Sequence, residues 1–60
     1  MELKQLKIGD KFWILGNPNL KHVEYEVTGK VSNCSIPVWN HSYHRSEQLG
    51  QYTNVIKIEY

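Results

Sequence analysis

The most regular stretch of the chain reads His22-Val23-Glu24-Tyr25-Glu26-Val27-Thr28. Its apolar residues Val23, Tyr25 and Val27 alternate with polar ones. Successive side chains of a β-strand point to opposite faces, so this spacing places the apolar residues on one side of a sheet. Such alternation is typical of an antiparallel strand with one face buried and the other in water. Residues 22–28 therefore predict a β-rich fold.

The residues that follow predict a bend and then a turn. Gly29 interrupts the alternation, and Lys30-Val31 resume it. A glycine at such a position suggests a bulge or a sharp bend, as small barrels need where a strand passes between sheets. Ser32-Asn33 then carries a turn signal.

A third strand is predicted at residues 35–40. Ile36 and Val38 would face one way, and Pro37 and Trp39 the other. Because proline has no N–H for a strand ladder, Pro37 predicts an edge strand or a bulge.

The segment 41–51 has no clear period. We expect a short strand around Tyr43 followed by a turn or a single helical turn near residues 44–50, and a short helix from Ser42 is the alternative. Residues 52–60 predict a last strand, in which Ile56 and Ile58 alternate with charged residues.

Toward the N-terminus, Gly9-Asp10 is a turn signal ahead of a strand at residues 11–15. Phe12 and Ile14 would share one face of that strand, and Trp13 would lie on the other. Residues 16–19 are dense in turn formers. The residues before Gly9 fit a short lead-in segment that covers one end of the core.

Together these elements predict an all-β fold, a small five-stranded barrel that forms one domain over residues 1–60. Closing the sheet would remove exposed strand edges, which are an aggregation hazard in a chain rich in strand formers. The expected core consists of Leu6, Ile8, Phe12, Ile14, Val23, Tyr25, Val27, Val31, Ile36, Val38, Ile56 and Ile58.

Composition limits the classes of function. The chain has 60 residues, of which 40% are hydrophobic and 22% charged, as in an ordinary globular domain. Seven Lys/Arg against six Asp/Glu give a net charge of +1, which argues against strong nucleic-acid binding by charge alone. Cys34 is the single cysteine, so an intrachain disulfide is impossible. The N-terminus lacks an apolar signal core and no apolar run approaches a membrane span, so we expect a cytoplasmic protein without membrane contact.

Two segments are similar to parts of SH3-like barrels. Residues 6–12 resemble the "L-x-x-G-D-x-hydrophobic" opening of many such barrels, and residues 25–31 resemble a "Y-x-V-x-G-x-V" second strand of short bacterial and phage proteins. The resemblance covers about half the chain and implies an SH3-like barrel. Members of this class bind peptides or nucleic acids, inhibit other proteins or serve as structural subunits.

No motif predicts catalysis or a bound cofactor. Cys34, His41 and His44 give the spacing C-x6-H-x2-H, but the usual zinc-finger pattern needs two cysteines, and histidines three apart diverge on a strand. A thiol triad drawn from Cys34, a histidine and Glu47 has no supporting spacing. We therefore expect that the protein binds no metal and no cofactor and that it is not an enzyme.

The best candidate for binding is the segment 39–45, which combines aromatic rings, imidazoles, an amide and a guanidinium. Aromatic residues and arginine are enriched at the energetic centres of protein interfaces. The expected binding residues are Trp13, Trp39, Asn40, His41, Tyr43, His44 and Arg45. The competing interpretation of Trp39 and Tyr43 is that their rings fill the end of the core.

Two functions fit this segment. The first is a protein-interaction module, such as a phage or mobile-element regulator or inhibitor that occludes a larger protein, with self-association possible. The alternative is a nucleic-acid-binding barrel in which bases stack on aromatic rings while cations track phosphates. It requires that the cations gather on one face with Trp39 and Tyr43, and the candidates are Lys11, Lys21, Lys30, Arg45 and Lys57. The balanced charge ranks it second.

Overall fold

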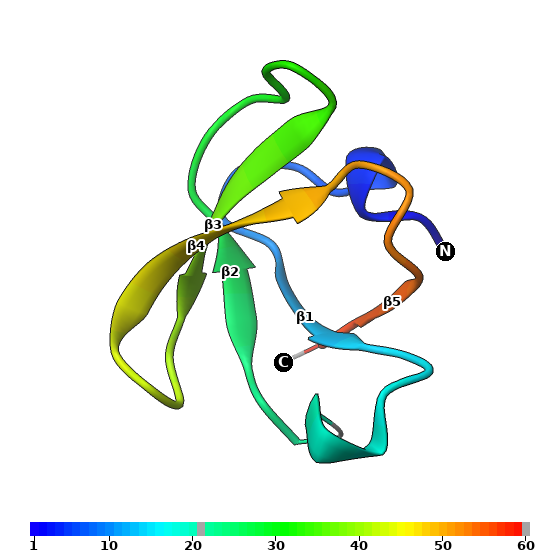
Figure 1. Ribbon diagram of the computed structural model, residues 1–60, viewed down its shortest axis with the longest axis vertical. Coiled ribbons are helices and arrows are strands. Elements are labelled where there is room, and N and C mark those ends of the chain that lie inside the picture. The colour runs from blue at the N-terminus through cyan, green and yellow to red at the C-terminus, as the bar shows by residue number, and fades with distance from the viewer. Residues whose placement is uncertain (21, 60) are drawn as a thin grey trace.

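Five antiparallel strands form one sheet in the order β4-β3-β2-β1-β5. The computed structural model describes residues 1–20 and 22–59. The strands are β1 (Lys11–Ile14), β2 (Tyr25–Val27), β3 (Ser35–Asn40), β4 (Arg45–Gly50) and β5 (Val55–Lys57), and the only helical elements among the described residues are two 3-10 turns, η1 (Leu3–Gln5) and η2 (Pro18–Leu20). Figure 1 shows the sheet strongly twisted and wrapped around a common interior. The prediction of a small all-β, five-stranded, barrel-like fold is confirmed.

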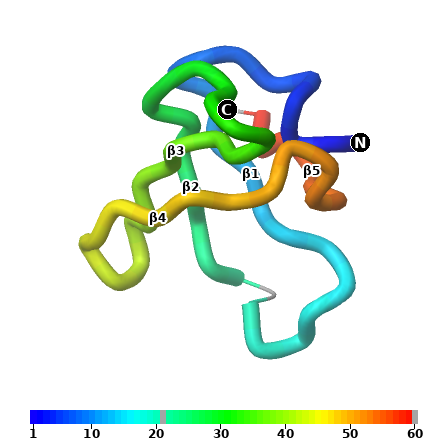
Figure 2. The backbone as a smooth tube through the Cα atoms, turned by 45° about the horizontal axis from the view of Figure 1, so that its top comes forward, coloured from blue at the N-terminus to red at the C-terminus, as the bar shows by residue number. Residues whose placement is uncertain are grey.

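Strands β1 to β4 pair in chain order, and β5 returns to the free side of β1. The N-terminal residues complete this side of the fold (Figure 2). The backbone N–H of Leu3 donates to the carbonyl of Thr53, that of Lys4 to Gln51, and that of Val55 to Met1. The segment before β1 therefore joins the connection between β4 and β5, and the buried side chain of Leu3 covers one end of the core.

The core follows the alternation of the strands. Phe12 and Ile14 of β1 are buried and Trp13 between them faces outward, as predicted. The rings of Phe12 and Tyr25, from paired strands, stack with centroids 5.4 Å apart. The buried hydrophobic residues are Leu3, Phe12, Ile14, Val23, Tyr25, Val27, Ile36, Val38 and Val55.

Strand β2 is shorter than the predicted 22–28, although its buried face is the predicted one. Gly29 forms a bend, as expected, but the strand does not resume at Lys30-Val31. A Cβ on Gly29 would lie 2.6 Å from Cγ of Pro37, so glycine permits a close approach of the chain to the proline ring.

The prediction that Pro37 marks an edge strand or a bulge is wrong. β3 lies between β2 and β4, and Pro37 is in register with Gln48 of β4. The carbonyl of Pro37 accepts a hydrogen bond from Thr28, just beyond the last residue of β2. Proline has no N–H to donate, but at this position the pairing of β2 with β3 ends. An interior strand therefore tolerates Pro37 there.

The predicted helical turn near residues 44–50 is also wrong, as are the strand around Tyr43 and the helix from Ser42. Residues 41–44 form a turn, and all six residues of β4 pair with β3. Pairing with an amphipathic neighbour decides this conformation, because the sequence Arg45–Gly50 has no alternation of its own.

Three predicted core residues are exposed: Ile8, Val31 and Ile56. Ile56 lies opposite Trp13 and Val55 lies opposite Ile14, so the buried face of β1 selects Val55 for the core. Ile8 and Val31 lie in connections outside the strands, where no neighbouring strand covers them. Leu6 and Ile58 are half-buried.

Candidate functional site

Asn40 organises the turn at the end of the β3–β4 hairpin. The residue is 1% exposed and lies on the same face as Ile36 and Val38. Its Oδ1 accepts hydrogen bonds from the backbone N–H groups of Ser42 and Tyr43, both at 2.9 Å. Asn40 was predicted to contact a ligand, but the polar atoms of its side chain form hydrogen bonds within the hairpin.

The amide of Asn40 also determines the electrostatics of Glu47. Its Nδ2 donates to Oε2 of Glu47 at 2.8 Å, and Nε of Arg45 donates to the same oxygen at 3.2 Å. The hydrogen bond from Asn40 lowers the pKa of Glu47; partial burial opposes this effect, and Arg45 reinforces it. Burial raises the pKa of Tyr25, and the negative charge of Glu47 adds to that shift.

The remaining residues of segment 39–45 do not form one surface. Trp39 is half-buried, and Nε2 of His41 lies 2.8 Å from Oε1 of Glu26 on the neighbouring strand. Tyr43 and His44 are exposed in the turn, and the guanidinium of Arg45 lies 5.5 Å from the centre of the Tyr43 ring. The structure thus brings Tyr43 and Arg45 together and directs Trp39 and His41 toward the outer face of β2 and β3.

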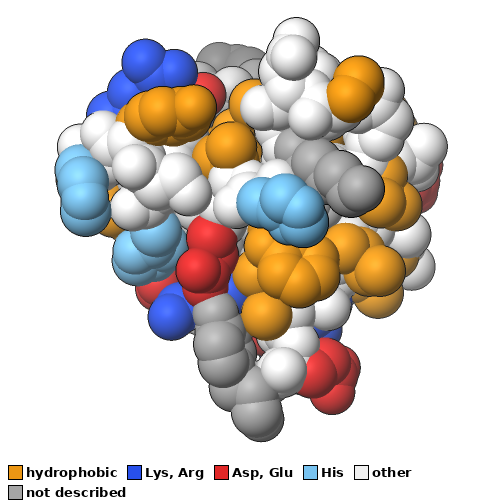
Figure 3. All heavy atoms as spheres, turned by 90° about the horizontal axis from the view of Figure 1, so that it is seen from below, with side chains coloured by type: hydrophobic (Ala, Val, Ile, Leu, Met, Phe, Trp, Pro, Cys, Tyr) orange, Lys and Arg blue, Asp and Glu red, His pale blue; other side chains and the backbone are white. Residues whose placement is uncertain are grey.

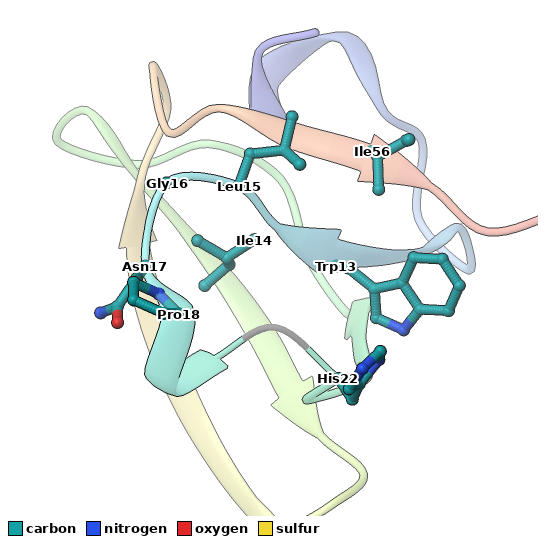
Figure 4. Close-up of a pocket in the computed structure, with 8 residues that line it drawn as sticks. All are labelled: Trp13, Ile14, Leu15, Gly16, Asn17, Pro18, His22 and Ile56. Atoms are coloured by element: carbon teal, nitrogen blue, oxygen red, sulfur yellow. The ribbon is translucent and has the colours of Figure 1, made fainter.

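Trp13, the other predicted binding residue, forms one wall of a groove. This apolar groove has a volume of about 530 Å³ and is lined by Trp13, Ile14, Leu15, Gly16, Asn17, Pro18, His22 and Ile56. In Figure 4, Trp13 and His22 lie at one end, and Asn17 and Pro18 at the other. On the face drawn in Figure 3, hydrophobic side chains form a contiguous cluster beside a histidine. None of the described lining residues comes from segment 39–45.

Several residues that line this groove were not predicted from the sequence to bind a partner. Trp13, Leu15 and Ile56 are 37%, 48% and 47% exposed. Leu15 follows Trp13 by two residues, so the alternation that turned Trp13 outward was a signal for Leu15 as well. Ile56 was predicted to be a core residue. It lies on β5 opposite Trp13, and it therefore lines the groove instead.

The cations are divided among separate surfaces. Lys57 lies 3.8 Å from Asp10, Arg45 pairs with Glu47, and Lys30 lines a second groove with Lys4 and Lys7. Lys11 is half-buried in β1, and Lys21 lies outside the described residues. Among the described cations, Arg45 lies beside the Tyr43 ring, and Lys11 lies opposite Glu26, which in turn lies opposite Trp39. The described cations therefore do not gather around both aromatic rings, as the nucleic-acid alternative requires.

Within residues 1–20 and 22–59, no three His, Cys, Asp or Glu side chains are placed to hold a metal ion. The thiol of Cys34 is exposed in a tight turn, with backbone φ of 64°. The described part of the chain contains no helix of the length and apolar character that a membrane crossing requires.

Comparison with family models, with curated proteins and with solved structures finds no match to this chain.

Proposed function

We propose that this chain is a small, non-enzymatic protein-interaction module that binds an apolar segment of a larger protein through the groove beside Trp13. The observation that carries the proposal is the exposure of Trp13, Leu15 and Ile56 around one concavity. Contiguous exposed apolar surface in a small domain marks an interaction site, and tryptophan is enriched at energetic centres of interfaces.

The chemistry of the groove favours a protein segment as its occupant. No Lys, Arg, Asp or Glu is among its described lining residues, and its few polar groups belong to Trp13, Asn17 and His22. Such a surface excludes water from apolar side chains while offering a small number of hydrogen bonds at the rim, which is the usual composition of a protein interface.

The remaining parts of the proposal rest on the sequence. The absence of catalytic motifs supports a role other than catalysis. The size of the chain and its SH3-like resemblance support a regulator or inhibitor from a bacterial phage or mobile element. The single Cys34 supports a cytoplasmic location.

Nucleic-acid binding ranks below protein binding. Single strands are held where aromatic rings and cations share one groove. Here Trp13 lines a groove with no described cation, and three lysines line another with no described aromatic residue.

The test compares three baits in a lysate of the source organism treated with nuclease: the unaltered chain, Trp13→Ala and Tyr43→Ala. Tyr43 is more exposed than Trp13 and lies outside the groove, so its variant is a matched loss of an aromatic surface residue. We expect a protein retained by the unaltered chain and Tyr43→Ala to be reduced at least about tenfold with Trp13→Ala. Circular dichroism and thermal melting establish that each bait is folded.

Equal capture by all three baits would contradict a contact at the groove. If only Tyr43→Ala failed to capture the protein, the binding site would lie at the β3–β4 turn instead. If oligonucleotides bind the chain at about 50 mM salt and Trp13→Ala changes nothing, the nucleic-acid alternative replaces the proposal.

A further inference from the structure

A second groove, also of about 530 Å³, lies between the segment before β1 and the connection from β2 to β3. These two segments meet at one end of the molecule in both backbone views (Figures 1 and 2). We call it the lysine-rimmed groove, because Lys4, Lys7 and Lys30 line it. No Asp or Glu is among its described lining residues.

Two Lys-aliphatic pairs frame this groove. Lys7-Ile8 comes from the segment before β1, and Lys30-Val31 from the connection after β2. The backbone N–H of Gly9 donates to the carbonyl of Val27 at 2.8 Å, which fixes the first pair beside the end of β2. Each pair contributes one cation and one exposed aliphatic side chain to the same concavity.

The cations of the groove are largely uncompensated. Among the described residues, the ammonium groups of Lys7 and Lys30 have no carboxylate partner. The nearby Asp10 accepts from the backbone of Lys7 and faces the ammonium of Lys57. Lys4 makes an exposed 3.7 Å pair with Glu2, a kind of contact that is weak and easily exchanged.

The groove also exposes apolar surface. Ile8 and Val31 are 57% and 52% exposed, and the buried residues Val27 and Ile36 form the floor between them. Covering aliphatic groups of this kind is favourable by about 25 cal/mol for each Å² removed from water. An occupant that satisfies the whole groove must therefore be both apolar and anionic.

An acidic, hydrophobic peptide meets both requirements better than a nucleic acid does. The described lining residues include no aromatic ring on which a base could stack. The ammonium of Lys4 lies 4.8 Å from the centre of the Tyr52 ring, which does not line the groove.

We propose that the lysine-rimmed groove binds a protein segment in which Asp or Glu flanks aliphatic residues, with the carboxylates at Lys7 and Lys30 and an aliphatic side chain between Ile8 and Val31. This site goes beyond the apolar groove and does not share a described lining residue with it.

The test uses the full chain labelled with ¹⁵N and a fluorescent peptide in which glutamate alternates with leucine. One control peptide has lysine in place of glutamate and another has serine in place of leucine. We expect saturable binding of the first peptide below about 1 mM, weaker binding of both controls, and amide shifts confined to the segments that line the groove, residues 4–8, 27–31 and 36. Binding should weaken as salt is raised.

Matched variants locate the contact. Lys7→Gln combined with Lys30→Gln should weaken binding about tenfold, whereas Lys57→Gln, which removes one charge outside the groove, should not. Ile8→Ser should weaken binding several-fold, whereas Leu15→Ser, a change of similar exposure in the apolar groove, should not. Trp13→Ala should also leave peptide binding unchanged, so that this proposal and the proposed function can fail separately.

Three results would overturn the inference. The first is failure of the glutamate–leucine peptide to saturate. The second is equal binding of the lysine-containing peptide. The third is preferential binding of an oligothymidine, or of vesicles containing anionic lipid, with the same amide shifts, which would assign the groove to a nucleic acid or a membrane surface.

Discussion

The side chain of Asn40 donates a 2.8 Å hydrogen bond to Glu47 while its oxygen accepts from the backbone of Ser42 and Tyr43. One buried amide thus connects the two strands of the β3–β4 hairpin and shapes the turn between them. An amide is suited to this position because it offers a donor and an acceptor side by side, which neither an aliphatic nor a carboxylate side chain provides.

Asn40→Ala should destabilise the fold by about 2–3 kcal/mol, because it removes three hydrogen bonds and leaves the Glu47 carboxylate without its amide donor. Urea unfolding followed by tryptophan fluorescence measures the change. Asn19→Ala removes the same side chain from an exposed position in η2 and should change stability by less than about 0.5 kcal/mol. Equal effects of the two substitutions would contradict the structural role of Asn40.

Stability should fall in acid through Glu47. The hydrogen bond from Asn40 lowers the pKa of Glu47 below its ordinary value of 4.5, so the folded state binds this proton more weakly than the unfolded state does. The contribution is complete above pH 4.5 and is lost as the pH falls through the lower folded pKa. In Glu47→Gln this position no longer titrates, so the free energy of unfolding of the unaltered chain should decline more between about pH 5 and pH 3 than that of the variant. If the free energy of unfolding changes with pH in the same way for the unaltered chain and the variant, Glu47 contributes nothing to the loss of stability in acid.

Gly29→Ala should destabilise the fold by about 1–3 kcal/mol, because the new Cβ would lie 2.6 Å from Cγ of Pro37. Gly50→Ala is the control, since a Cβ there meets only the Thr53 hydroxyl at 3.7 Å. The double variant Gly29→Ala with Pro37→Ala removes the ring atom that clashes, so the two changes should cost less together than the sum of each alone. Strict additivity would rule out the contact as the cause.

Cys34→Gly should stabilise the fold by about 1 kcal/mol, because glycine adopts a positive φ without the steric cost of a Cβ. Asn33 and Cys34 both have positive φ, 50° and 64°, between residues Ser32 and Ser35 that exchange backbone hydrogen bonds. This is the pattern of a type I′ hairpin turn, for which Asn-Gly is the preferred pair. Cys34→Ala removes the thiol but keeps Cβ, so it should give no comparable gain in melting temperature. A gain with alanine equal to that with glycine would contradict a backbone origin.

Local alternation predicted the bounds and the buried faces of β1 and β3, and it predicted the buried face of β2 but not its length. β1 and β3 fall within one residue of their expected bounds, and the buried faces at Phe12, Tyr25 and Val38 are those expected. The turn expected at Ser32-Asn33 lies one residue later, at Asn33 and Cys34.

Other positions depend on partners that local sequence does not reveal. Val55 and Ile56 are adjacent and both apolar, and only their pairing with Ile14 and Trp13 decides which of them enters the core. The conformation of residues 45–50 likewise comes from the neighbouring β3. Of the predicted binding residues, Trp13 is the one that lines the apolar groove, because its position between two buried neighbours turns it outward.

The hydrogen bonds from Leu3 and Lys4 to Thr53 and Gln51 have a consequence for the order of events during synthesis. They join residues separated by nearly the whole chain, so the contacts that seal one end of the core close a very long loop. A growing polypeptide cannot make them until the connection between β4 and β5 has left the ribosome. The β1–β4 meander can pair before that moment, whereas the end of the core beneath Leu3 stays open, so this end should be the last part of the fold to close during synthesis.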